Sequence, residues 1–346
     1  MIKDFVADNQ FMNFPSTRYM GSKNKIIHSL WEHLSNYQFD SFLDVFAGSN
    51  VVSYFMKCKG KEVTTNDFLS FSFIAAKATI ENSHTQLSNE DVMFLMEENN
   101  NNGFIQATFD NIFFTPEENK FLDRTRFNIE LIQDEYKRAI ALSALVRSCV
   151  KKRSRGIFTF VGERYDDGRE DMKKPLSEHF IESVGIYNKA VFNNHKDNRS
   201  FNLPSHEFTQ TKDLVYLDPP YYSPKSDNDY VRRYHFVEGM VKGWDGLDIQ
   251  HHTKVKKFKS YESPFSKKVT TYSAFEHLIQ QYSDSIIAIS YSSNSLPTKD
   301  ELKALLLKYK SKVEIHEINH VYSFGNQNHK IGNVNNRVKE YLFIGE

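Results

Sequence analysis

The sequence contains few cysteines, no long apolar run and no excess of charge. Its two cysteines, Cys58 and Cys149, lie far apart and form no Cys-x-x-Cys pair, so neither a disulfide framework nor a zinc or other metal site is predicted. No apolar run approaches membrane-spanning length, and the first residues lack the basic-then-apolar pattern of a signal peptide. We therefore expect a globular protein of the cytoplasm that does not contact a membrane.

Positive charge is not in surplus either, because the 44 lysines and arginines balance the 44 aspartates and glutamates. The surface as a whole is therefore not expected to carry the positive field of a nonspecific nucleic-acid binder. Any contact with nucleic acid must come from local basic clusters, which occur at residues 147–155, at Arg232-Arg233 and at residues 254–259. A solvated face is the alternative for each cluster, and we favour it for the third, which no motif supports.

Two phosphate-binding signatures are also absent. The stretch Asp44 to Asn50 is a small-residue turn after an apolar strand, but it has neither the Gly-x-Gly-x-x-Gly spacing nor the lysine of a phosphate-binding loop. This disfavours NAD and ATP as ligands. Asp67 ends the next expected strand, where a carboxylate accepts hydrogen bonds from ribose hydroxyls, although helix capping is its alternative role. A nucleoside ligand without pyrophosphate, such as S-adenosylmethionine, fits this pattern.

Strand and helix patterns alternate near the N-terminus. Residues 41–46 predict a buried strand, residues 51–58 a helix, and residues 61–67 a second strand followed by a helix through Ile80. This alternation predicts an α/β fold with a parallel sheet. Residues 82–198 change to a polar sequence with helical periodicity, best patterned from Tyr136 to Val150, which we interpret as a helical insertion. Strand patterns resume at residues 214–217, 285–290, 312–318 and 340–344.

The tetrapeptide Asp218-Pro219-Pro220-Tyr221 directly follows the strand predicted at residues 214–217. The exocyclic amine of adenine or cytosine is a weak nucleophile, because its lone pair is conjugated with the ring. The Asp218 carboxylate and the Pro219 carbonyl would draw that lone pair out by accepting hydrogen bonds from the amine, and Tyr221 would stack on a base taken out of a duplex. A simple turn is the alternative, but ligands of open α/β sheets bind beyond the carboxyl ends of strands, where this tetrapeptide lies.

With Arg18-Tyr19-Met20-Gly21-Ser22-Lys23 upstream, the order of these segments resembles that of the Dam-like DNA adenine-N6 methyltransferases. That family has an N-terminal Tyr/Trp-x-Gly-x-Lys segment, a small-residue turn, an acidic strand end, a helical target-recognition insertion and then Asp-Pro-Pro-Tyr. The resemblance implies a Rossmann-like methyltransferase sheet, mostly parallel with an antiparallel C-terminal strand, plus the helical insertion. It also implies methyl transfer from S-adenosylmethionine to the N6 amine of a flipped-out adenine in double-stranded DNA, with room for a cognate restriction endonuclease as a partner.

The residue patterns and the resemblance together identify candidate site residues. Those for catalysis are Asp218, Pro219, Pro220 and Tyr221. Those for the cofactor are Tyr19, Gly21, Lys23, Asp44, Phe46, Ala47, Gly48, Ser49, Asn50, Asp67, Phe68, Glu207, Phe208 and Asp218. Those for DNA are Arg147, Lys151, Lys152, Arg153, Arg155, Arg232 and Arg233. The chain departs from the family at Asn50, where a second glycine is usual, and at Glu207, where aspartate is more frequent. Asparagine adopts left-handed conformations more readily than most residues, so the first change is tolerable.

Three parts of the chain are expected on this basis. Residues 1–81 would bind the cofactor, residues 82–198 would form the target-recognition domain, and residues 199–346 would carry methyl transfer. Residues 222–270 within the last part are charged and irregular, and we assign no secondary structure to them. Their aromatic and basic content suits a loop that orders on DNA.

Several alternatives stay open from the sequence alone. Cytosine-C5 methylation is disfavoured, because it needs a thiolate nucleophile and neither Cys58 nor Cys149 has the expected setting. Cytosine-N4 methylation and methylation of adenine in RNA use the same amine chemistry and remain as rivals. A noncatalytic DNA-binding subunit of a methylase is a further alternative, against which the intact tetrapeptide, Lys23 and Asp67 argue.

Overall fold

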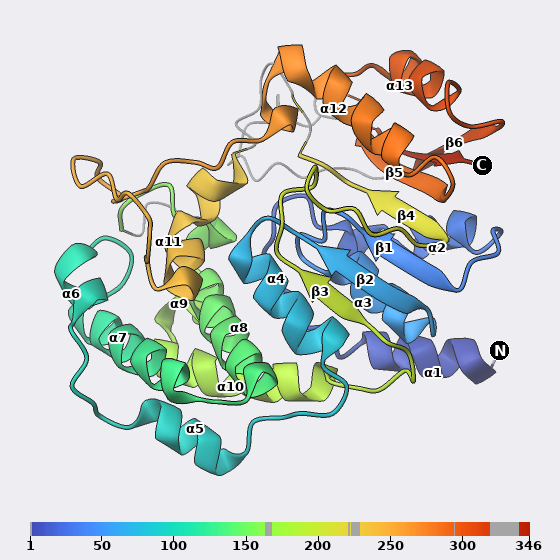
Figure 1. The fold of residues 1–346 in the computed structure, drawn as a ribbon. Coiled ribbons are helices and arrows are strands. Elements are labelled where there is room, and N and C mark those ends of the chain that lie inside the picture. The colour runs from blue at the N-terminus through green and yellow to red at the C-terminus, as the bar shows by residue number, and fades with distance from the viewer. Residues whose placement is uncertain (1, 163–167, 221, 223–228, 294, 319–338) are drawn as a thin grey trace.

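The computed structural model of the protein describes residues 2–162, 168–220, 222, 229–293, 295–318 and 339–346. Its centre is a seven-stranded sheet with the order β3-β2-β1-β4-β5-β7-β6 (Figure 1). The strands are β1 Ser41–Asp44, β2 Glu62–Asn66, β3 Arg199–Phe201, β4 Leu214–Leu217, β5 Ile286–Ser292, β6 Val313–Ile318 and β7 Glu340–Gly345. β1 to β5 pair in parallel, whereas β7 is antiparallel to β5 and β6. The predicted mostly parallel sheet with an antiparallel C-terminal strand is confirmed.

Helices cover both faces of this sheet. α1 (Ile2–Phe11), α2 (Ile27–Leu34) and α3 (Val51–Cys58) belong to the layer on one face, and α12 (Lys268–Gln281) and α13 (Lys299–Leu306) to the layer on the other. Neighbouring residues of β1 point to opposite faces of the sheet. Phe42 packs with α2 and α3, and Leu43 packs with α12 and α13. This is the two-residue period of a strand that is buried on both faces.

A group of helices lies to one side of the sheet (Figure 1). Its members are α4 Ser70–Ala76 with the π-helical turn η2 Lys77–Glu81, α5 Asn89–Met96, α6 Phe104–Thr108, α7 Pro116–Leu131, α8 Glu135–Lys152, α9 Glu170–Lys173, α10 Leu176–Ala190 and α11 Tyr230–Lys242. Apolar side chains of all these helices except α9 share one buried cluster. The long helices begin at well-capped residues: Thr115 and Glu118 form a capping box on α7, and Asp134 accepts two backbone N–H groups at the start of α8.

Most of the predicted elements are confirmed. The helix predicted at residues 51–58 coincides with α3, and the helix predicted at 136–150 lies within α8. The strand patterns at 41–46, 61–67, 214–217, 285–290, 312–318 and 340–344 correspond to β1, β2, β4, β5, β6 and β7. The short strand β3 was not predicted, because it has only three residues and its sequence Arg-Ser-Phe contains no apolar run.

Helix α11 was not predicted either, although it occupies 13 residues of the segment that we left unassigned. Nearly all of its side chains from Val231 to Met240 are buried, so the sequence lacks the one-sided apolar pattern of a surface helix. Its ends carry readable signals: the Asp229 side chain accepts the backbone N–H of Arg232, and Gly243 follows the helix with a left-handed φ of 64°. α11 packs with the helices of the insertion, although it comes from the C-terminal half of the chain.

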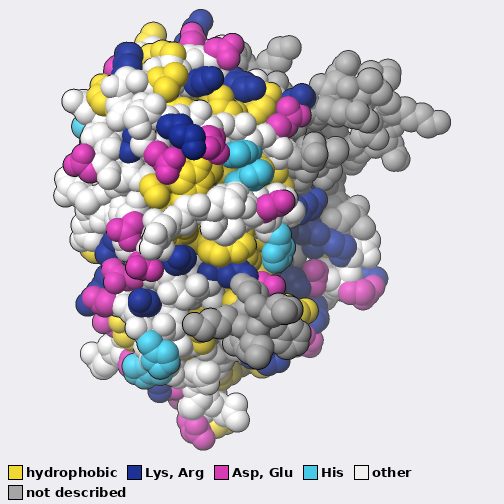
Figure 2. Space-filling model, turned by 90° about the vertical axis from the view of Figure 1, so that its right-hand side faces the viewer, with side chains coloured by type: hydrophobic (Ala, Val, Ile, Leu, Met, Phe, Trp, Pro, Cys, Tyr) yellow, Lys and Arg dark blue, Asp and Glu magenta, His cyan; other side chains and the backbone are white. Residues whose placement is uncertain are grey.

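Three 3₁₀ turns lie in the described connections. η1 (Lys23–Lys25) and η3 (Ser154–Gly156) carry residues discussed below, and η4 (Pro264–Ser266) precedes α12. On the face shown in Figure 2, acidic and basic side chains are interspersed rather than separated into fields of one sign. None of the helices in the described ranges is both long and apolar enough to cross a membrane.

Candidate active site

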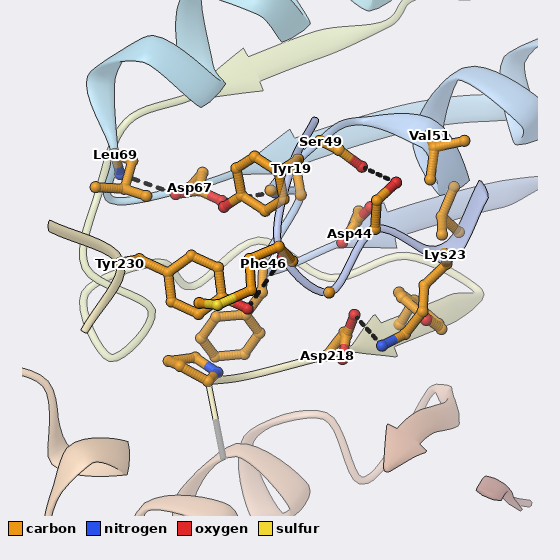
Figure 3. A pocket seen from close by; sticks show the side chains of 18 of the residues that line it. Tyr19, Lys23, Asp44, Phe46, Ser49, Val51, Asp67, Leu69, Asp218 and Tyr230 are labelled. Carbon is orange, nitrogen blue, oxygen red and sulfur yellow. Dashed lines mark hydrogen bonds and ion pairs between the residues drawn. The ribbon is translucent and has the colours of Figure 1, made fainter. Parts of the chain in front are cut away.

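A cleft opens where β1, β2 and β4 reach their carboxyl ends. β1 lies between β2 and β4, so the chain leaves the sheet in opposite directions on its two sides, and such a switch point is where open α/β sheets bind ligands. About 560 Å³ of space, which includes open solvent, lies among the residues that line this cleft. Figure 3 shows Asp44, Asp67 and Asp218 around the same hollow. Its lining includes the predicted Tyr19, Gly21, Lys23, Asp44, Phe46, Ala47, Gly48, Ser49, Asp67, Phe68, Asp218 and Pro220.

The segment Tyr19-Met20-Gly21 forms one wall of the cleft and is held by α11. The Met20 backbone N–H donates to the Tyr234 hydroxyl at 2.8 Å, and the Tyr230 hydroxyl donates to the Met20 carbonyl at 3.2 Å. The Tyr19 ring is stacked against Tyr234, with centroids 5.3 Å apart, and against Tyr230 at 5.7 Å. Helix α11, which follows the Asp-Pro-Pro-Tyr segment in the chain, therefore fixes a wall of the cleft that lies some 200 residues earlier.

The turn after β1 brings the backbone close to this wall. Gly48 has a φ of 51°, and a Cβ atom there would lie 3.1 Å from the Tyr19 ring, so glycine is required by both conformation and space. Asn50 has a φ of 64°, and its side chain donates to the Ser72 carbonyl at 2.9 Å. Asn50, which replaces the second glycine of the family, thus has a left-handed backbone conformation, which asparagine adopts more readily than most residues.

Two buried carboxylates face the cleft from the ends of β1 and β2. Asp44 accepts a hydrogen bond from the Ser53 hydroxyl at 2.7 Å through Oδ2, whereas its Oδ1 has no partner among the described groups. Asp67 accepts the backbone N–H of Gly48 at 2.7 Å and that of Leu69 at 2.8 Å. Burial raises the pKa of each carboxyl from 3.8 to about 7, because a low-dielectric setting disfavours the charged form.

Asp218 lies at the end of β4 and is paired with a buried lysine. The Lys23 ammonium is 3.0 Å from Asp218 Oδ2 and 3.1 Å from Glu340 Oε1. Pro219 is buried and Pro220 lines the cleft, while Tyr221 lies outside the described residues. The catalytic motif and the N-terminal motif predicted from the sequence therefore meet in space through Lys23.

Three predicted cofactor residues do not line the cleft: Asn50, which is buried beneath the turn, and the pair Glu207 and Phe208. Glu207 is exposed, with its carboxylate 3.7 Å from the ring of its neighbour His206. Phe208 is only 2% exposed and packs against Phe201 in the core behind the sheet. Neither lines the main cleft, whereas a smaller hollow beside it is lined by Ser205 and His206 together with Phe46 and Phe68.

The basic cluster at residues 147–155 divides into buried and exposed side chains. Arg153 is 1% exposed, and its guanidinium donates to the Phe160 carbonyl at 2.8 Å and the Gly162 carbonyl at 3.0 Å. Arg147 is also buried and donates to the Ser183 hydroxyl. The expectation that these two side chains hold DNA does not agree with their positions, because both point into the protein and bind its own polar groups.

The lysines of this cluster are half-buried and form ion pairs with acidic residues of the helical insertion. Lys151 lies 3.0 Å from an oxygen of Asp171, and Lys152 lies 2.7 Å from one of Glu118. Arg155 is exposed and has a φ of 59°, a left-handed conformation that is unusual for arginine.

The loop that carries Arg155 contacts the helix that carries the second basic cluster. The Phe158 backbone N–H donates to the Arg233 carbonyl at 2.9 Å, which joins the loop after α8 to α11. Gly156 lies against Arg18, since a Cβ there would be 2.9 Å from the Cβ of Arg18. The loop that carries Arg155 therefore contacts both α11, at Arg233, and the N-terminal segment, at Arg18.

Sequence reasoning missed three residues that shape the site. Tyr230 and Tyr234 hold the Tyr19-Met20-Gly21 wall of the cleft. They are four residues apart on α11, so a helix predicted at this segment would have placed both on the same face. Glu340 is an acid at the head of an otherwise apolar strand, which is an unusual residue type for a fully buried position.

Comparisons with known proteins agree with this geometry. A family model described as D12 class N6 adenine-specific DNA methyltransferase matches residues 19–324. The chain is 28% identical to the Type II methyltransferase M2.HphI of Haemophilus parahaemolyticus, in an alignment that covers 96% of this chain and 98% of that protein. It is 26% identical to the modification methylase StsI of Streptococcus sanguinis and 25% identical to the Type II methyltransferase M.FokI of Planomicrobium okeanokoites.

The last two alignments cover 84% of this chain but only 46% of each relative, so the chain spans less than half of those proteins. The family model extends over most of the sequence, from Tyr19 to beyond β6. Because it describes enzymes that methylate adenine in DNA, the alternatives of cytosine-N4 methylation, RNA methylation and a noncatalytic subunit are set aside. The chain belongs to the D12 class of N6 adenine-specific DNA methyltransferases.

Proposed function

We propose that the cleft binds S-adenosylmethionine and that the methyl group is transferred there to the N6 amine of an adenine swung out of double-stranded DNA. The observation that carries this proposal is the charge of the cleft. Among the described lining residues, Lys23 is the one cation beside the carboxylates of Asp44, Asp67 and Asp218. Such a site suits a cationic nucleoside and disfavours the anionic phosphates of NAD or ATP.

The residues present fit this cofactor. The unpartnered Oδ1 of Asp44 is a buried acceptor that the cofactor's ammonium would satisfy. Each oxygen of Asp67 has already accepted one backbone N–H group, and a carboxylate oxygen retains a further lone pair for a ribose hydroxyl. Phe46 and Phe68 are half-buried and offer apolar surface for an adenine ring between the main cleft and the smaller hollow.

When bound in the cleft, S-adenosylmethionine would supply a methyl group activated by its sulfonium; transfer would break the methyl–sulfur bond, leave neutral S-adenosylhomocysteine and release one proton from N6 to solvent. Asp218 would accept a hydrogen bond from the target amine and so raise electron density on that nitrogen. The Pro219 carbonyl would accept a hydrogen bond from the second amine hydrogen, and Tyr221 would stack on the base. Lys23 holds one oxygen of Asp218 and thereby limits rotation of its carboxylate.

DNA would lie across the exposed arginines beside the cleft. Arg155 and Arg232 are exposed and Arg233 is half-buried, and their segments are joined by the hydrogen bond between Phe158 and Arg233. We include Arg18 in this surface because it abuts the Arg155 loop. Lys151 and Lys152 stay in the proposal as secondary contacts, since both already form ion pairs. Residues 82–198 would supply target recognition, together with α11.

The experiment is transfer of tritiated methyl from S-adenosylmethionine to unmethylated DNA, followed by nucleoside analysis, with Asp218→Ala as the matched variant. We expect N6-methyladenine from the unaltered protein and a loss of at least about 1000-fold in the variant, because the acceptor for the amine is removed. Label in N4-methylcytosine, or equal activity of the variant, would overturn the assignment.

A cognate restriction endonuclease is part of the proposal, since relatives carry the names of type II methyltransferases. DNA from cells that express this protein would then resist an endonuclease of the same target sequence, and DNA from cells that express Asp218→Ala would be cut.

A further inference from the structure

A buried ion cluster extends from the cleft to the last strand. Glu340 is the first residue of β7, and since β7 runs antiparallel to β5, its beginning lies at the edge of the sheet where β4 ends. The Glu340 side chain is fully buried, and its Oε1 lies 3.1 Å from the Lys23 ammonium. The Ser290 hydroxyl, on β5, donates to the same Oε1 at 2.7 Å.

Lys23 therefore sits between two carboxylates. Its ammonium is 3.0 Å from Asp218 on one side and 3.1 Å from Glu340 on the other. Figure 3 marks the ion pair with Asp218. The lysine is 4% exposed and Glu340 is 0% exposed, whereas Asp218 is 18% exposed on the side of the cleft. One carboxylate is enough to balance the lysine charge, so the second leaves the buried cluster with a net negative charge when all three groups are ionised.

The excess negative charge strengthens Asp218 as a hydrogen-bond acceptor. An ammonium that is shared with Glu340 withdraws less electron density from Asp218 than an ammonium paired with Asp218 alone, because the two acids compete for the same positive charge. The Ser290 hydrogen bond fixes Glu340 from the far side, which fixes the end of the lysine chain in turn. Among the described residues, Asp44, Tyr216 and Tyr230 are further titratable groups that interact with this cluster.

We propose that Glu340 is a positioning residue for methyl transfer: it holds the Lys23 ammonium in place against Asp218 and keeps that carboxylate a strong acceptor for the target amine. The inference rests on the proposed role of Asp218. Glu340 does not line the cleft, so its effect on the reaction passes through Lys23.

The test is Glu340→Gln, which keeps the size of the side chain and an oxygen for the Ser290 hydroxyl but removes the charge. We expect kcat to fall about 10-fold to 100-fold, the range found for groups that orient a reacting residue. KM for the cofactor and for DNA should change by less than about twofold, because the interaction acts on the chemical step. The acidic limb of the kcat profile should move to lower pH, since Lys23 then favours the ionised form of Asp218 more strongly.

A double-mutant cycle separates this role from a merely structural one. In a Lys23→Gln background, Glu340→Gln should cause no further loss of kcat, because Glu340 acts through the lysine. Asp123→Asn is the matched control, since Asp123 is also buried but accepts the backbone N–H groups of Ile105 and Gln106 at the start of α6. That control should lower the melting temperature without moving the acidic limb.

Folding of each variant is checked by circular dichroism and thermal melting. If Glu340→Gln does not fold, Ser290→Ala serves instead, because it removes the hydrogen bond and keeps the charge; kcat should then fall about 2-fold to 10-fold. A folded Glu340→Gln protein with an unaltered kcat and pH profile would overturn the inference, as would an equal loss in both lysine backgrounds. Activity in Asp218→Ala would instead overturn the proposed function.

Discussion

Replacing Asp44 with asparagine should make the protein more stable and its cofactor binding weaker at the same time. The pKa of Asp44 is raised from 3.8 to about 7 by burial, which corresponds to about 4 kcal/mol of free energy lost when this carboxylate is ionised in the folded protein. Asparagine carries no charge but is still a buried polar group, at a cost of about 1–3 kcal/mol. We therefore expect a net gain of about 1–3 kcal/mol at pH 8, or about 1–4 °C in melting temperature.

The pH dependence of this gain follows from linkage. Because the pKa of Asp44 is raised in the folded state, its contribution favours folding at low pH and is lost as the pH rises from about 4 to about 7. The difference between Asp44→Asn and the unaltered protein should thus be small at pH 4.5 and largest above pH 7. Thermal melting without cofactor, followed over this range for both proteins, measures it.

Cofactor binding should move in the opposite direction. A hydrogen bond between charged partners contributes about 1.5–3 kcal/mol, so Asp44→Asn should raise the Kd for S-adenosylmethionine about 10-fold to 150-fold. The Kd of the unaltered protein should rise as the pH falls below about 7, because Asp44 then takes up a proton, and the variant should lack this rise. Isothermal titration calorimetry at pH 6 and pH 8 gives both values.

Asp67→Asn is the matched comparison, since its carboxyl has a similarly raised pKa. Unlike Asp44, Asp67 accepts two backbone N–H groups, and an amide has only one oxygen to accept them. This variant should therefore be less stable than the unaltered protein. The reasoning on Asp44 is refuted if Asp44→Asn melts lower than the unaltered protein and binds the cofactor equally well.

Three further predictions concern the walls of the cleft and its basic rim. Gly48→Ala should raise the cofactor Kd at least about 10-fold in calorimetry, because its Cβ would lie 3.1 Å from the Tyr19 ring at a φ of 51°; unchanged binding would contradict this. Tyr234→Phe loses the 2.8 Å bond from Met20 and should weaken cofactor binding about 3-fold to 10-fold, whereas Tyr272→Phe, on the exposed side of α12, should not. Arg155→Ala should weaken DNA binding and flatten its salt dependence without changing the melting temperature. Arg153→Ala should instead lower the melting temperature by several degrees, because the carbonyls of Phe160 and Gly162 lose their donor. A lower melting temperature for Arg155→Ala together with weaker DNA binding by a fully stable Arg153→Ala would contradict these two roles.

The sequence by itself determined the chemistry of the site and much of the sheet. The apolar run at residues 214–217 and the tetrapeptide behind it place Asp218 at a strand end, since strand period and turn residues are local properties. The same holds for Asp44 and Asp67, which end β1 and follow β2 and which the parallel pairing brings to one edge. Asn50 was readable as well, because a left-handed turn depends mainly on the residue that adopts it.

Only the tertiary structure decided which charged side chains meet and which are buried. Arg153 and Arg155 look alike in the sequence, but Arg153 is buried because carbonyls of Phe160 and Gly162 converge on it, whereas Arg155 stays exposed. Glu340 faces Lys23 because β7 enters the sheet antiparallel, and no local pattern encodes a contact across more than 300 residues. α11 is hidden for the same reason: a helix buried on most sides has no amphipathic period, and its burial comes from elements elsewhere in the chain.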